Sequence, residues 1–145
     1  MATTRFELVT PNRTLYSGSA EMIVCRSVDG EIAFLANHMP YIGALDAGLV
    51  RIVGPAPEGA EEPSGEPDIR LAVQGGFVEV KDNHVIMLAD VAELASEIDV
   101  AAAERDRDEA EQRVSAGGLE PDPELATALR WAQARIEAAT GAPVH

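Results

Sequence analysis

The sequence predicts an α+β fold in which a β-sandwich or small β-barrel is followed by an antiparallel pair of helices. Up to about residue 90, apolar residues come in short runs separated by turn residues, as in all-β domains. Beyond Glu97 they recur at helical spacing instead. The length supports this division, because 145 residues with 46% hydrophobic content can bury one core and carry an appendage.

The candidate strands are short and closely spaced. The turns expected between them are SVDGE, DAG, QGG, KDN and a long acidic loop. In AEMIVCR both faces are apolar, because Met22 and Val24 alternate with Ile23 and Cys25, and this is typical of a sandwich strand. In chain order the candidates are RFELVT, AEMIVCR, EIAFL, YIGAL, GLVRIV, IRLAV, GFVEV and NHVIMLA.

The acidic loop covers residues 54–68 and has four prolines, three glycines and no apolar residue larger than alanine. Such a segment buries too little to order itself, so we expect a mobile extension of a hairpin. Its glutamates lack the D-x-[DN]-x-[DN]-G register that wraps a calcium ion. A solvated surface is therefore expected here rather than a metal site.

Two helices are expected after Glu97. Asp99 can cap the first, VAAAERDRDEAEQRV, and Asp122 followed by Pro123 can start the second. The break between them, at residues 115–118, predicts an antiparallel hairpin. Its apolar stripes are mostly alanine and bury little area, so the hairpin must rest on its own sandwich or on a partner. The larger side chains, which we expect to anchor it, are Leu125, Leu129 and Ile136.

Charge and cysteine usage exclude several classes of protein. The formal net charge is -14, from 25 acidic and 11 basic side chains, and such a field repels nucleic acid and anionic lipid headgroups. No apolar run is long enough to span a membrane, and the first residues do not resemble a signal peptide. Cys25 is the only cysteine, so no internal disulfide can form. A cytosolic chain is expected.

The catalytic interpretation depends on His38, which lies with Pro40 in the otherwise apolar stretch GEIAFLANHMPYIGAL. The chain has three histidines, and no two of them have the spacing of metal ligands. No phosphate-binding loop, G-x-S-x-G elbow or plausible acid partner for His38 is present. A turn histidine bonded to backbone is thus favoured over catalysis, and no catalytic residue, metal or cofactor is expected.

Five segments in chain order carry a family resemblance that extends over nearly the whole chain. They are LVTPNRTLYSG, VDGEIAFLANHMP, ALDAGLVRI, GGFVEVKDNHVIMLADVAE and EIDVAAAERDRDEAE. Together they resemble the epsilon subunits of rotary F-type ATP synthases. The resemblance implies a sandwich of about ten strands at residues 1–92 and a regulatory helical hairpin at 93–145.

The resemblance also implies a non-catalytic role in the central stalk. The sandwich would bind the gamma subunit and stand on the c ring, and so couple proton-driven rotation to ATP synthesis. The hairpin would lie on the sandwich, or extend toward the alpha and beta subunits and restrain ATP hydrolysis. The chain would then be peripheral, at the cytoplasmic face of the bacterial membrane, and associated with that membrane only through the complex.

Individual positions follow from the same resemblance. Glu31, His38 and Pro40 match a family turn close to G-E-L-G-I-L-P-G-H-A-P, and we expect them at the end of the sandwich that faces the c ring. In this chain Ala33, Ala36 and Asn37 replace a glycine, a proline and a glycine of that turn.

Some members of the family bind ATP through an I-D-x-x-R-A motif at the start of the first helix. Ile98, Asp99 and Ala103 match this motif, but Ala102 stands where the arginine belongs. Loss of the guanidinium removes the fork that grips phosphate, so weak or no ATP binding is expected.

Two other functions stay open from the residues alone. One is a stand-alone ligand-sensing β domain with a helical interaction arm, in which the ligand would bind between sheet and hairpin. The other is a β-sandwich enzyme that uses His38, and it has the least support.

Overall fold

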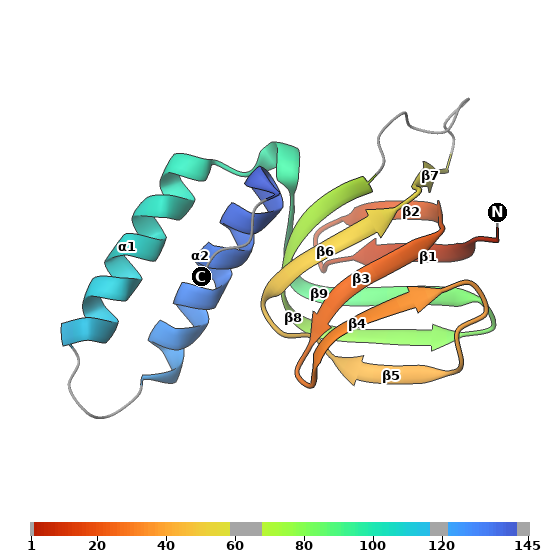
Figure 1. Ribbon diagram of the computed structural model, residues 1–145, viewed down its shortest axis with the longest axis horizontal. Coiled ribbons are helices and arrows are strands. Elements are labelled where there is room, and N and C mark those ends of the chain that lie inside the picture. Colours follow the sequence, from red (N-terminus) through yellow and green to blue (C-terminus); the bar gives the residue numbers. More distant parts are fainter. Residues whose placement is uncertain (1, 59–67, 117–121, 142–145) are drawn as a thin grey trace.

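A computed structural model describes residues 2–58, 68–116 and 122–141. It shows a β-sandwich with a pair of antiparallel helices at one side (Figure 1), which confirms the predicted fold class. Most of the acidic loop predicted at residues 54–68 lies outside the described residues. The strands are β1 (Thr4–Val9), β2 (Thr14–Ala20), β3 (Met22–Ser27), β4 (Gly30–Leu35), β5 (Tyr41–Ala44), β6 (Gly48–Val53), β7 (Ala56–Pro57), β8 (Asp68–Lys81) and β9 (His84–Leu94).

The strands are hydrogen-bonded in the order β4-β3-β6-β8-β9-β1-β2-β7, and β5 also pairs with β8. The long β8–β9 hairpin belongs to both layers of the sandwich, because the first part of β8 pairs with β6 and the last part with β5. All neighbours run antiparallel except β1 and β9. Side chains from both layers enclose one core, whose largest fully buried members are Phe6, Phe34, Leu8, Ile23, Ile52, Leu71 and Met87.

The QGG segment does not separate two strands, so that prediction was wrong. β8 continues through Gly75 and Gly76, and its register with β9 is the same on both sides, from Leu71 opposite Leu94 to Lys81 opposite His84. The two glycines have φ of 72° and 96°, so the chain bends there without leaving the ladder.

Residues 14–20 form a strand that the sequence did not reveal. β2 alternates buried and less buried positions, but its buried side consists of Tyr16, Gly18 and Ala20, so no hydrophobic run marks it. The proposed division of the chain at residue 92 falls inside β9, which continues to Leu94 and leads into the short helix η1 (Ala95–Glu97).

The helices are α1 (Val100–Ala116) and α2 (Pro123–Thr140), and both predicted caps are confirmed. The Ala102 N–H donates to Asp99 Oδ1 at 3.0 Å. The N–H groups of Glu124 and Leu125 donate to Asp122 Oδ1 at 2.9 and 3.4 Å. Residue 141 ends α2 as a left-handed glycine cap.

The hairpin rests on its own sandwich. Helix α2 lies between α1 and the strands (Figure 1) and packs on β6 and β8. The seam contains mainly small side chains, as the alanine-rich stripes predicted. It consists of Ala72, Ile98, Ala134 and Ala138, with Leu49, Trp131 and Ala139 at its edge.

Candidate interaction surfaces

The structure separates Glu31 from His38 and Pro40. Glu31 lies next to the β3–β4 turn, opposite Arg26, whereas His38 and Pro40 follow the other end of β4. Figure 1 shows that β4 runs from the side of the sandwich near the helices to the opposite side. The expectation that all three residues share one end of the sandwich is therefore wrong, because a whole strand lies between them.

His38 belongs to a turn held by backbone contacts. Its Nδ1 lies 2.7 Å from the Met39 carbonyl oxygen, and its N–H donates to the Leu35 carbonyl at 3.2 Å. The imidazole ring makes a T-shaped contact with the Phe34 ring, at 5.0 Å between centroids. Asn37 has a left-handed φ of 61°, a conformation in which asparagine is the usual substitute for glycine. These contacts confirm the predicted turn histidine.

An apolar patch covers the outer face of β5, β8 and β9. It consists of Ile42, Ala44, Phe77 and Leu88, and we call it the outer patch. Ala44 is opposite Phe77, and Phe77 is opposite Leu88, so the three form a row across the sheet. The exposed fractions of Ile42, Phe77 and Leu88 are 69%, 41% and 40%. Exposed apolar side chains in a contiguous row are typical of an interaction surface.

Sequence reasoning missed the outer patch, although a signal was present. The runs GFVEV and NHVIMLA carry apolar residues at odd and even positions, which predicts apolar side chains on both faces of a strand. Only one face can enter the core of a two-layer sandwich. The other face is left to solvent or to a partner.

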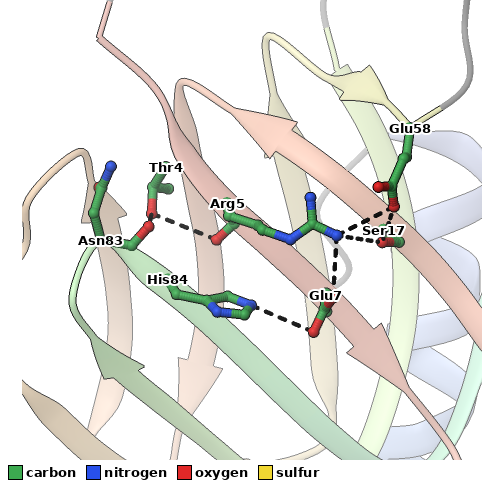
Figure 2. Close-up of polar contacts among 7 residues, drawn as sticks. All are labelled: Thr4, Arg5, Glu7, Ser17, Glu58, Asn83 and His84. Carbon is green, nitrogen blue, oxygen red and sulfur yellow. Dashed lines mark hydrogen bonds and ion pairs between the residues drawn. The ribbon is translucent and has the colours of Figure 1, made fainter.

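A polar cluster spans β1, β2 and β9 and includes Glu58, the residue after β7 (Figure 2). Arg5 Nη2 lies 3.2 Å from Glu7 Oε1, 3.1 Å from Glu58 Oε2 and 3.1 Å from Ser17 Oγ. His84 Nε2 is 3.3 Å from Glu7 Oε2 but outside hydrogen-bond geometry. The hydrogen bond that Arg5 donates to Glu58 lowers the pKa of the Glu58 carboxyl and raises the pKa of the Arg5 guanidinium. The cluster thus ties the start of the acidic loop to β1 and β2.

The residues that match the ATP motif have structural roles. Asp99 caps α1, and Ile98 and Ala103 are buried, the former in the seam between hairpin and sandwich. Ala102 is half-buried and brings no charge to this position.

The predicted anchors do not lie in the seam's central cluster. Ile136 is buried, whereas Leu125 and Leu129 are half-buried, and all three lie on the side of α2 that carries Ala132. The side chains that join α2 to the strands are instead those of Trp131, Ala134, Ala138 and Ala139. The anchoring role expected for these three residues stays a prediction.

In the described ranges, no group of three or more histidine, cysteine, aspartate or glutamate side chains could hold a metal ion. None of the helices in those ranges combines the length and the apolar character that crossing a membrane requires. Burial raises the pKa of the Cys25 thiol to about 12, so this cysteine is a core residue rather than a nucleophile.

Comparison with known proteins gives the family. A family model described as ATP synthase, Delta/Epsilon chain, beta-sandwich domain matches residues 3–95, and these contain every strand described above. The ATP synthase epsilon chain of Desulforamulus reducens is 37% identical over 138 residues, which are 94% of this chain and 97% of that relative. The chain belongs to the family of ATP synthase epsilon chains.

Other epsilon chains are similar over much of their length. That of Brevibacillus brevis is 41% identical over 109 residues, 75% of this chain and 76% of the relative. That of Mycobacterium bovis is 39% identical over 119 residues, 81% and 91%. A chain in a cryo-EM structure of the Euglena gracilis mitochondrial ATP synthase, with OSCP, F1 and c-ring, has the same fold with a TM-score of 0.72. It is 22% identical and spans 96% of this chain and 82% of that chain.

Proposed function

We propose that this epsilon chain is a non-catalytic subunit of the central stalk, where it links the gamma subunit to the c ring and couples proton-driven rotation to ATP synthesis. The observation that carries the proposal is the outer patch, which exposes large apolar side chains on a face of the sandwich away from the seam with α2. A subunit that transmits torque needs a firm, desolvated contact, and apolar area supplies it.

The outer patch is the proposed gamma-binding surface. Met39, which is 72% exposed, follows His38 in the loop that leads into β5, close in sequence to Ile42 of the outer patch. We therefore assign His38 and Pro40 to the gamma side. Rigid strands present this surface, so little conformational entropy is lost on binding.

Glu31 is the proposed contact to the c ring. It is exposed at the start of β4, together with Val28 and Asp29 of the preceding turn. An exposed carboxylate can meet polar loops without complete desolvation, and it gives the contact specificity rather than strength. Glu31→Lys should weaken proton pumping in membranes while the isolated chain keeps its stability. Pumping that stays intact in a destabilised variant would show that Glu31 is structural.

The hairpin is the proposed regulatory arm. It lies docked on the sandwich here, and an extended arm would reach the alpha and beta subunits and restrain hydrolysis. The complex would hold the chain at the cytoplasmic face of the bacterial membrane as a peripheral protein.

A binding experiment with purified gamma subunit tests the outer patch. Phe77→Asp should weaken the affinity at least about tenfold, because burial of one large apolar side chain is worth ~1.5 to 3 kcal/mol. Val114→Asp is the matched control, since Val114 is also exposed, at 48%, but lies on α1. Equal affinity of the two variants would place the gamma contact elsewhere.

A further inference from the structure

The hairpin is joined to the sandwich by a short linker and one seam. Helix α1 packs mainly on α2, and α2 alone makes extensive contact with the strands. The centre of the seam is formed by alanines on the helix side, Ala134 and Ala138, against Ala72. Small side chains bury little area, so polar contacts have a large share in deciding how firmly the hairpin is docked.

Arg135 is placed at the junction of three units. From α2 its Nε lies 3.1 Å from Glu93 Oε1 on β9, and its Nη2 lies 3.4 Å from Glu93 Oε2. Its Nη1 lies 3.5 Å from Asp106 Oδ2 on α1. One guanidinium therefore faces a carboxylate of the sandwich and a carboxylate of the hairpin.

Burial makes the Glu93 contact the stronger of the two. The side chain of Arg135 is 15% exposed and that of Glu93 is 28% exposed, whereas that of Asp106 is 63% exposed. Solvent screens the Asp106 pair, and a pair with little solvent access is screened much less. The buried Nε is close to Glu93 without hydrogen-bond geometry, so the attraction at that atom is electrostatic.

We propose that the Arg135–Glu93 pair is the latch that holds the helical hairpin on the sandwich. If the hairpin leaves as a unit, Arg135 loses Glu93 but keeps Asp106, because Asp106 moves with it. Glu93 then controls docking, and Asp106 controls only the packing of α1 on α2. The latch is a property of this chain and does not depend on which partners it binds.

Other contacts across the same interface lie on either side of Arg135 along α2. Arg70 Nε donates to the Ala138 carbonyl at 2.8 Å, and Arg130 Nε lies 3.5 Å from Asp46 Oδ1. The first holds backbone rather than a charged side chain, and the second is a longer pair whose side chains are 45% and 35% exposed. The Arg135–Glu93 pair lies between these two contacts along α2. It has less solvent access than the Arg130–Asp46 pair, and this distinguishes it as the latch.

Thiol labelling of the full chain measures docking directly. Ala134 is 2% exposed in the seam, so the thiol introduced by Ala134→Cys reacts only when the hairpin is undocked. Its labelling rate then follows the population of the undocked state. The native Cys25 is 1% exposed in the sandwich core, and its labelling reports unfolding of the sandwich in the same sample.

In the chain that carries Ala134→Cys, we expect Glu93→Gln to accelerate labelling at position 134 roughly fivefold. Asp106→Asn should change the labelling rate less than twofold. Cys25 labelling should stay constant. Added salt should accelerate labelling at position 134 when Glu93 is present and much less after Glu93→Gln.

A double-mutant cycle separates the pair from other effects of Glu93, which also lies near Arg13. Arg135→Gln should accelerate labelling about as much as Glu93→Gln, and the double variant should be little faster than either. Fully multiplicative effects would overturn the proposal. So would equal effects of Glu93→Gln and Asp106→Asn, or a rise in Cys25 labelling that parallels the rise at position 134.

Discussion

The bend of β8 gives the sharpest prediction about stability. Gly76 has φ of 96°, and a Cβ built on it would collide with the backbone carbonyl of Leu88 on β9. Backbone in a strand pair cannot move aside without breaking the ladder. Gly76→Ala therefore adds a steric clash to the cost of an unfavourable dihedral, which is itself about 1 to 3 kcal/mol. We expect a total loss of at least ~3 kcal/mol in the free energy of unfolding, a large fraction of what a domain of this size has.

Two other glycines separate the cost of the steric clash from the cost of the unfavourable dihedral. Gly30 has φ of 121° but nothing within 4 Å of its Cβ position, so Gly30→Ala costs only the dihedral term. At Gly75 the neighbour is the Asp90 carboxylate, a side chain that can rotate away, so the cost should be intermediate. Urea unfolding with an unchanged m-value measures all three. If Gly76→Ala costs no more than Gly30→Ala, the backbone contact at the bend does not exist and the reasoning fails.

Three further predictions concern the hairpin and its linker. Ile136→Ala should lower the free energy of unfolding by ~2 to 4 kcal/mol. This loss should exceed that of Leu125→Ala or Leu129→Ala, because Ile136 is 5% exposed and the two leucines are half-buried. Equal losses in urea titration would show that the three positions are equivalent. The hydrogen bond from Arg13 lowers the pKa of Glu97 from 4.5, so the pair stabilises the fold above about that pH and this stabilisation is lost as the pH falls. Glu97→Gln should therefore reduce the fall of the melting temperature between about pH 6 and pH 3. An unaltered pH profile would contradict this role of the pair. Because Asp99 is used as a cap and Ala102 brings no guanidinium, calorimetry should detect no ATP binding at micromolar concentrations, and binding that Arg130→Ala abolished would show that another arginine compensates.

Local features were predictable because the interactions that form them are local. Both helix caps, the turn at His38 and the alanine-rich stripes follow from residues a few positions apart. The strand β2 was not predicted because its buried face consists of Tyr16, Gly18 and Ala20, which give no hydrophobic pattern. The QGG segment looked like a turn because glycine marks turns, although the same freedom of φ also permits a bend inside a strand.

Long-range features could not be predicted from the sequence in the same way. Glu31 and His38 are close in sequence, yet the strand between them places them at opposite ends. Arg135 and Glu93 are far apart in sequence, and only the docking of α2 brings them together. The outer patch lies between these cases, since its apolar residues were visible but the face they occupy depends on how the two layers pair.

An epsilon chain that works within the rotary complex should be recovered together with its partner subunits. Affinity purification of the tagged chain from bacterial membranes, with the complex intact, measures this association. We expect recovery of the alpha, beta and gamma subunits together with the c ring, and lower recovery of these subunits with Phe77→Asp than with Val114→Asp. Recovery of the tagged chain alone, with none of these subunits, would show that the chain does not work in the rotary complex.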